Sequence, residues 1–176
     1  MFKFVACVGA TSLTILGTGA SGSILGPDAA RCGANDGPAI LVHVAGLKDR
    51  QGQVRTRIFG GAPSTWFDKR NALKRTEVPI PANGAVDICM PVERPGVYAV
   101  DIRHDTNGNG KTEIADGGGL SGNPDVSLFD IVLKRRPPAD KVSVRVGDGI
   151  TPVTIIVKYK QGGSFKAIAP LQSTQR

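Results

Sequence analysis

The sequence predicts an all-β protein, an antiparallel β-sandwich of about seven to eight strands that is immunoglobulin-like or transthyretin-like. Helical periodicity is nearly absent, and short runs of alternating or β-branched residues recur between clusters of Gly, Pro, Asn and Asp. This spacing of strands and turns is typical of a sandwich or barrel. We expect strands near residues 38–46, 53–60, 75–80, 85–90, 96–104, 126–133, 141–147 and 152–160.

Alternation within these segments indicates which side of each strand is buried. In the strand expected at 96–104, Tyr98, Val100 and Ile102 fall on one face and polar residues on the other. The last two strands alternate in the same way, with one apolar face each: Val142, Val144 and Val146, then Val153, Ile155 and Val157. The one helix that the sequence allows is a short turn at 66–75, where Trp66, Ala72 and Leu73 could share a face.

Residues 1–20 have the pattern of a signal peptide. Lys3 precedes an apolar stretch that is too short to span a bilayer, and small residues follow it. Thr18 and Ala20 provide the small side chains that a signal peptidase requires, so we expect cleavage after Ala20, with Gly22 or Ala30 as alternatives. No later apolar run is long enough to cross a membrane. We therefore expect a periplasmic or secreted protein with no transmembrane segment after signal removal.

Removal of the signal would leave two cysteines, Cys32 and Cys89, in an oxidising compartment, where a disulfide is the default. In the strand at 85–90 the alternation directs Cys89 away from the core, so the disulfide should lie outside the sheet. The predicted organisation is an N-terminal segment at 21–37 that the disulfide holds, a sandwich domain at 38–160 and a flexible tail at 161–176.

The most informative segment is the loop at 105–116, which reads D-x-N-x-N-G-K-x-E-x-x-D. It matches the twelve-position calcium loop at positions one, three, five, seven, nine and twelve, with a glycine at position six. The six candidate ligands are Asp105, Asn107, Asn109, Lys111 through its backbone carbonyl, Glu113 and Asp116. A strand and a Gly-rich segment flank the loop, so it is not an EF-hand. We expect a weak structural calcium site; the alternative is a tight turn whose Asx side chains bond only to the backbone.

Positive charge is unevenly distributed along the chain, which carries a formal net charge of +7. Eight basic residues and two acidic ones lie between Lys48 and Arg75. An exported protein rarely meets nucleic acid, so an anionic envelope glycan or lipid surface is the better partner, and a solvated face is the alternative. The candidate ligand contacts are Trp66, Phe67, Lys69 and Arg70, because an aromatic side chain beside cations suits an anionic sugar. Ordinary packing is the alternative for Trp66.

Several segments together resemble one bacterial family. They are Gly-Gln-Val-Arg at 52–55, Phe59, Ala-Leu-Lys at 72–74, Pro-Gly-Val-Tyr-Ala-Val at 95–100, Arg-His-Asp at 103–105 with Asn-Gly-Lys at 109–111, and Val-Thr-Ile at 153–155. On these residues the chain resembles domain of unknown function 2141. The resemblance implies a secreted or periplasmic bacterial β-sandwich and implies no reaction. Where the family has an aromatic-rich stretch, this chain has Gly117, Gly118 and Gly119, which implies a reduced ligand surface there.

We therefore expect an exported, non-enzymatic module of the cell envelope that binds a glycan, a peptide or an envelope protein, or that serves only as an accessory domain. The alternative is a metal-assisted hydrolase that uses His104 and neighbouring carboxylates. His43 and His104 are the only histidines, and no G-x-S-x-G or H-E-x-x-H motif is present. Each common arrangement of nucleophile and base therefore lacks a part.

Overall fold

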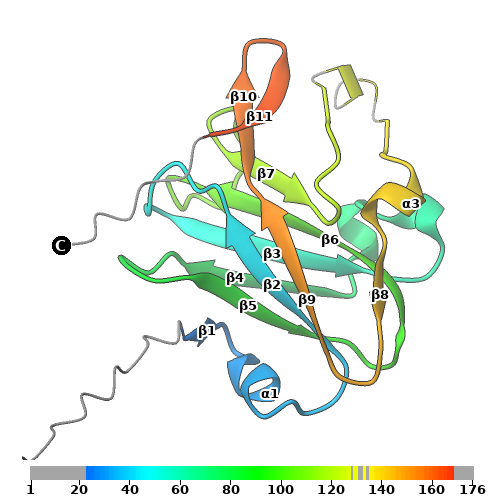
Figure 1. The fold of residues 1–176 in the computed structure, drawn as a ribbon. Helices are drawn as coiled ribbons and strands as arrows, with labels where there is room; N and C mark the ends of the chain where they lie inside the picture. The colour runs from blue at the N-terminus through cyan, green and yellow to red at the C-terminus, as the bar shows by residue number, and fades with distance from the viewer. Residues whose placement is uncertain (1–22, 128, 131–132, 134, 169–176) are drawn as a thin grey trace, which may run out of the picture.

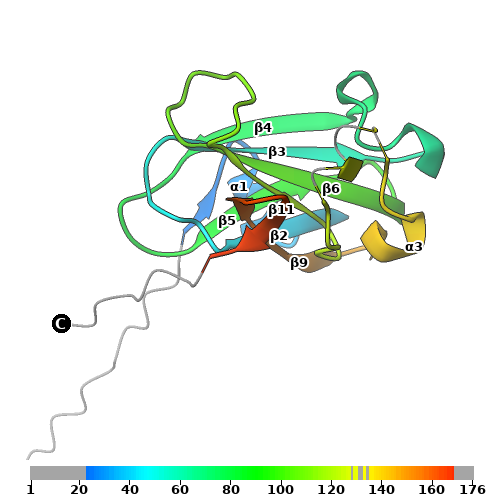
Figure 2. The same cartoon turned by 90° about the horizontal axis from the view of Figure 1, so that it is seen from above.

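The computed structural model describes residues 23–127, 129–130, 133 and 135–168, which form two packed β-sheets (Figures 1 and 2). The smaller sheet has the order β1 (Ile24–Leu25), β5 (Val86–Pro91), β2 (Ala39–Ala45) and β9 (Ile150–Ile156). The larger sheet has the order β11 (Ser164–Ala167), β10 (Lys158–Gln161), β7 (Gly117–Leu120), β6 (Gly96–Asp105), β3 (Gln53–Phe59) and β4 (Lys74–Pro79), and β8 (Val144–Val146) also pairs with β6. The predicted all-β sandwich class is confirmed.

Two strand pairs are parallel, although the sequence predicted an antiparallel sandwich. β1 runs parallel to β5, and β2 runs parallel to β9 over its whole length. The other pairs of named strands are antiparallel. A tight turn cannot join parallel neighbours, and β2 and β9 come from opposite ends of the described chain.

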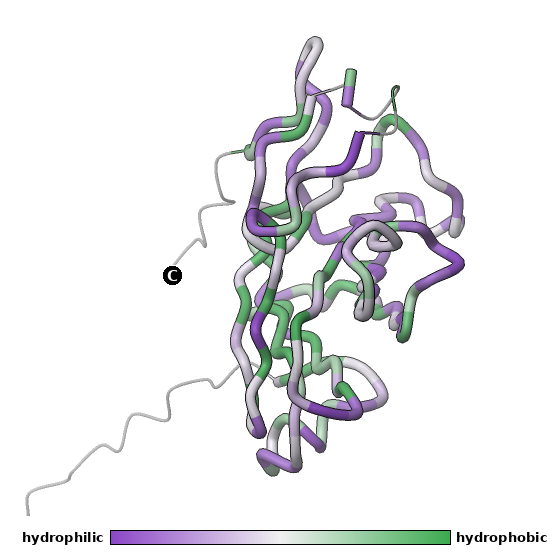
Figure 3. Tube along the Cα trace, turned by 90° about the vertical axis from the view of Figure 1, so that its right-hand side faces the viewer, coloured by the Kyte–Doolittle hydropathy of each residue, from purple (hydrophilic) through white to green (hydrophobic). Residues whose placement is uncertain are grey.

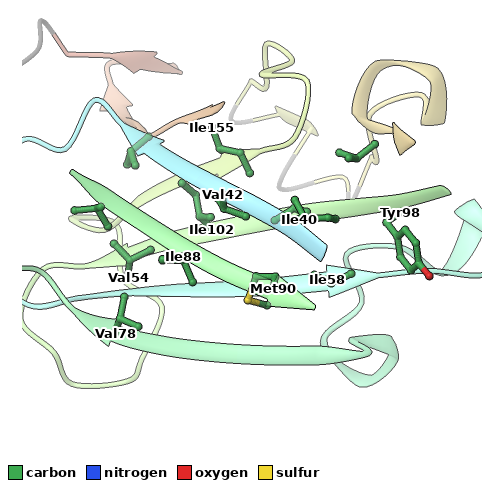
Figure 4. Close-up of a cluster of buried hydrophobic side chains, with 14 of the residues drawn as sticks. Ile40, Val42, Val54, Ile58, Val78, Ile88, Met90, Tyr98, Ile102 and Ile155 are labelled. Carbon is green, nitrogen blue, oxygen red and sulfur yellow. The ribbon is translucent and has the colours of Figure 1, made fainter. Parts of the chain in front are cut away.

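The core lies between the two sheets, as Figure 4 shows. Its side chains include Ile40, Val42, Val54, Ile58, Val78, Ile88, Met90, Tyr98, Ile102 and Ile155. The predicted inner face of β6 is confirmed, since Tyr98, Val100 and Ile102 are all buried. Figure 3 shows the matching pattern along the chain, with hydrophobic residues concentrated in the sheets and many hydrophilic ones in the loops.

Two expected elements were wrong. The segment at 126–133 is not a strand among its described residues: Ser127 makes an isolated bridge to Ser164, and helical geometry begins at Phe129. The cause is local, because the backbone N–H and hydroxyl of Ser127 donate to Asp130 and the N–H of Asp130 donates to Ser127, a capping arrangement that starts a helical turn. The helix expected at 66–75 is also absent. Its place is taken by the 3₁₀ turns η1 (Pro63–Thr65) and η2 (Lys69–Asn71) and by the start of β4.

The C-terminal part of the domain also differs from expectation. The strand expected at 141–147 begins later, because α3 (Ala139–Val142) precedes β8. The strand expected at 152–160 is two strands, β9 and β10, which belong to different sheets. Part of the predicted flexible tail at 161–176 forms β11, which pairs with β10. Residues 169–176 lie outside the described residues, as does the predicted signal peptide at 1–20.

The predicted disulfide is present, and it lies on the outer face of the smaller sheet. Cys32 lies in the short helix α1 (Ala29–Gly33), and its Cα is 5.8 Å from that of Cys89 on β5. Both cysteines are buried together with Ala39 of β2. The bond therefore holds the N-terminal segment against the outside of the sandwich, as the alternation predicted. Within the described chain, no helix has the length and apolar character needed to cross a membrane.

Candidate functional site

The candidate calcium loop connects β6 to β7 on the larger sheet. Asp105 is the last residue of β6, and Asp116 directly precedes β7, so strand pairing fixes both ends of the loop. Both aspartates are buried, whereas the residues between them are mostly exposed. The loop therefore presents two buried carboxylates beneath a solvated turn.

Asp105 uses one carboxylate oxygen to organise the loop and leaves the other without a partner. Oδ2 accepts hydrogen bonds from the backbone N–H of Gly110 at 2.8 Å and from Arg103 at 3.1 Å. Oδ1 is buried and has no hydrogen bond partner among the described residues. Burial alone would raise the pKa of Asp105, but the bonds from Gly110 and Gln53 and the charge of Arg103 hold it below its usual value.

The other predicted ligands bond mainly to one another and to the backbone. Glu113 accepts from the side-chain amides of Asn107 and Asn109, each at 2.9 Å. The side-chain oxygens of the two asparagines accept backbone N–H groups two residues further on, and the carboxylate of Asp116 accepts those of Thr106 and Glu113. In the described part of the chain, no three His, Cys, Asp or Glu side chains converge as a metal-binding set. A cation here would depend on amide and carbonyl oxygens around Asp105.

Arg103, which the sequence analysis did not select, lies beneath the loop. Its guanidinium contacts Asp105, donates to the hydroxyl of Thr112 at 2.5 Å and has its Nε 3.9 Å from Oδ2 of Asp116. The side chain is only 5% exposed. Because residues two apart on a strand share a face, Arg103 and Asp105 could have been recognised as neighbours from their spacing.

His104 points to the opposite face, into the core. Its Nε2 donates to the carbonyl of Gln51 at 2.8 Å, since a carbonyl can only accept. In the neutral ring Nδ1 then accepts from the hydroxyl of Tyr159 at 2.5 Å. The imidazole is fully buried. Burial raises the pKa of Tyr159 to about 12. Both histidine nitrogens are thus occupied by structural hydrogen bonds.

The four predicted ligand contacts do not form one surface. Trp66 is 2% exposed and packs with Phe59, Ala99 and Val142, so it is a core residue rather than a contact. Arg70 is exposed and pairs with Asp68, and Lys69 is also exposed. Phe67 is half-buried and packs edge-on against Phe59, with ring centroids 5.4 Å apart. Its φ of 64° is unusual for a bulky residue.

Phe67 lines a pocket of about 270 Å³ over β7, on the outer face of the larger sheet. Apolar groups form most of the lining, and three cations lie among them: Arg135, Arg136 and Lys158. Lys158 is neutralised by Asp125, at 2.9 Å. A larger cavity of about 780 Å³ lies elsewhere, where β3 and β5 end, and has a more polar lining that includes Arg31, Lys74 and Arg94.

The glycines of β7 account for the shape of the smaller pocket. A Cβ at Gly117 would lie 2.4 Å from Val157 Cγ1, and one at Gly119 would lie 2.7 Å from Ile155 Cγ2, so both glycines permit close packing against the core. A Cβ at Gly118 would meet nothing nearer than the carbonyl oxygen of Ile102, at 3.8 Å. Gly118 therefore leaves the floor of the pocket without a side chain.

These features define a small β-sandwich protein with a polar loop and a pocket on one sheet. A family model described as "Uncharacterized protein conserved in bacteria (DUF2141)" matches residues 42–154. The match spans more than half of the chain, and the chain belongs to this family, as the sequence resemblance indicated. No curated protein and no solved structure matches the chain.

Proposed function

We propose that the protein is an exported, non-enzymatic binding module of the bacterial cell envelope, periplasmic or secreted, whose ligand occupies the pocket over β7. The observation that carries the proposal is the bare floor at Gly118, which gives depth to an apolar pocket that Phe67 borders. Small-molecule sites are concave and mostly apolar, with a few polar groups at the rim.

The same geometry supports binding rather than hydrolysis. The alternative of a metal-assisted hydrolase needs His104 to exchange protons with a substrate. That imidazole is fully buried and bonded at both nitrogens. His43 pairs with Asp87 at 2.7 Å on the smaller sheet, whereas the loop carboxylates belong to the larger sheet, and His43 lines neither cavity. Neither histidine is therefore placed to act as a general base.

The pocket is tested with octyl glucoside below its micelle concentration, measured by titration calorimetry. We expect binding with a negative heat-capacity change, since apolar surface is buried, and none for glucose. Gly118→Val should weaken binding at least tenfold, because valine fills the floor in a strand position without positive φ. Gly147→Val is the matched control, since a Cβ there meets nothing within 4 Å and Gly147 does not line the pocket. Absence of binding to the parent, or equal binding to Gly118→Val, would refute the proposal.

We propose in addition that residues 105–116 bind calcium as a structural ion. The supporting observation is Asp105 Oδ1, a buried carboxylate oxygen without a partner, directed by a loop that already donates Gly110 N–H to the other oxygen. Calcium takes six to eight oxygen ligands, including amide and backbone oxygens, in flexible geometry. Asn107, Asn109 and the carbonyl of Lys111 would complete the set with Glu113 and Asp116.

Melting curves in EDTA, magnesium and millimolar calcium test this site. Calcium at a hundred times its dissociation constant should add about 2.7 kcal/mol of stability, and magnesium should add much less. Asp105→Ala should abolish the effect, but it also removes the partner of Arg103. Asn107→Ala is therefore the second variant, because Asn107 is exposed and does not contact Arg103. Equal midpoints for the parent in EDTA and calcium would show that the loop does not bind calcium. Arg103 would then be the positive group that balances the loop carboxylates.

A further inference from the structure

A group of arginines lies on the outer face of the larger sheet, on strands that flank the loop and outside the pocket lining. Arg55 and Arg57 are on β3, Arg75 is on β4 and Arg103 is on β6; we call these four residues the arginine row. The strand register places Arg55 directly opposite Arg103, and Arg57 directly opposite Arg75. Neighbouring strands are about 4.8 Å apart. Three of the eight basic residues that cluster in the sequence at 48–75 are therefore also clustered in space.

Three members of the arginine row have ion partners. Arg57 makes a two-pronged contact with Asp101, and the Arg57 side chain is 13% exposed. Arg75, which is 53% exposed, pairs with Glu77, and Arg103 pairs with Asp105. These carboxylates belong to the same sheet, at cross-strand or adjacent same-face positions.

Arg55 is different, because no carboxylate in the described chain lies within ion-pair distance of it. Its Nε is buried and has no hydrogen bond partner among the described residues. Glu77, the residue opposite it on β4, bonds to Arg75 instead. Burial and repulsion from Arg57, Arg103 and Arg75 lower the pKa of the Arg55 guanidinium from its usual value. Like charges directly opposite each other destabilise a sheet, so this arrangement weakens the isolated protein.

We propose that Arg55, with Arg57 and Arg75 at its side, binds an oxyanion, a phosphate or carboxylate group of an anionic envelope component. The planar guanidinium fork matches both groups and accepts them in bidentate geometry. Arg103 is too buried to touch the ligand and contributes only its positive potential. A bound anion would give the Arg55 guanidinium the ion partner that no described carboxylate of the sheet provides.

Oxyanion binding at Arg55 does not require the pocket over β7, although both sites lie on the same face of the larger sheet. Gly118 is opposite Arg103 in the register between β6 and β7. A ligand could therefore span the two sites, but each has its own test. Gly118→Val should weaken occupation of the pocket at least tenfold and leave the oxyanion response unchanged.

The experiment compares thermal midpoints of the parent, Arg55→Gln and Arg145→Gln in chloride, phosphate and glucuronate at equal ionic strength. Arg145 on β8 is the matched control, since it is an exposed strand arginine outside the arginine row. We expect phosphate, glucuronate or both to raise the parent midpoint above its value in chloride. A response to phosphate alone identifies a phosphate ester as the ligand group, and a response to glucuronate alone identifies a uronic acid.

The decisive comparison is between Arg55→Gln and the parent. It should have a higher midpoint than the parent in low-salt chloride, because repulsion is relieved, and at least tenfold weaker oxyanion binding. Arg145→Gln should keep the oxyanion response of the parent. The proposal is overturned if neither anion raises the parent midpoint, if Arg55→Gln keeps the response, or if Arg55→Gln is less stable than the parent in chloride.

Discussion

Reduction of the bond between Cys32 and Cys89 should lower the stability of the domain without unfolding it. The cysteines are 57 residues apart, and closing a loop of that length stabilises a fold by about 4 kcal/mol in the chain-entropy model. For a domain of this size each kcal/mol shifts the melting temperature by about 2–4 °C. Reduction should therefore lower the midpoint by about 8–16 °C. The core between the sheets does not include the cysteines, so the sandwich should persist.

The assay is a thermal melt with and without a phosphine reductant, combined with hydrogen exchange. Exchange should accelerate first in β1 and α1, because only two residues of β1 pair with β5. The double variant Cys32→Ala/Cys89→Ala is the control, and its midpoint should not respond to the reductant. An unchanged midpoint for the reduced parent would refute the loop-closure reasoning. Complete unfolding at room temperature would show that the core cannot hold the fold alone.

Three further predictions concern buried groups. Tyr159→Phe should reduce the loss of stability that the parent shows above pH 10, because the folded state keeps the phenol proton up to a pKa of about 12 while the unfolded chain releases it near 10. Urea unfolding at pH 9 and 11 tests this. An equal fall in unfolding free energy between the two pH values for parent and variant would contradict it. Asp101→Asn should cost about 3 kcal/mol in denaturant unfolding, because it leaves the largely buried Arg57 without its ion partner, and a loss below about 1 kcal/mol would argue against that pairing. Gly119→Val should cost about 1–3 kcal/mol, since its side chain would collide with Ile155, whereas Gly118→Val should melt like the parent.

The inner faces of the strands could be predicted because the alternation of β6 and β9 has a period of two wherever one side is buried. The same alternation concealed the break between β9 and β10. Ile155, Val157 and Tyr159 all face the core, although the chain passes from one sheet to the other between them. No turn residue marks that passage, so one long strand was the natural expectation.

β7 could not be predicted, since Gly117, Gly118 and Gly119 have no side chains to show a period. Its strand geometry is set by pairing with β6 and by close packing against β9 and β10. The candidate site was partly predictable in the same sense. The spacing of Asp, Asn and Glu residues placed Asp105 and Asp116 at the ends of the loop. Arg103 belongs to the preceding strand, which the loop pattern does not cover. The arginine row could not be predicted from the sequence, because only the register of β3, β4 and β6 brings its members together.

The parallel pairing of β2 with β9 has a consequence for how the protein reaches its native state. Each residue of β2 meets a partner more than a hundred residues later, from Ala39 with Ile150 to Ala45 with Ile156. Contacts between residues so distant in sequence stabilise the fold only after the chain has lost much conformational entropy. Folds that depend on such contacts form on the millisecond-to-second scale. The smaller sheet cannot be completed until β9, which ends at Ile156, has been synthesised. Until then β2 lacks one of its two neighbours in the sheet, so the complete sandwich can form only late, after its first strands have already left the ribosome.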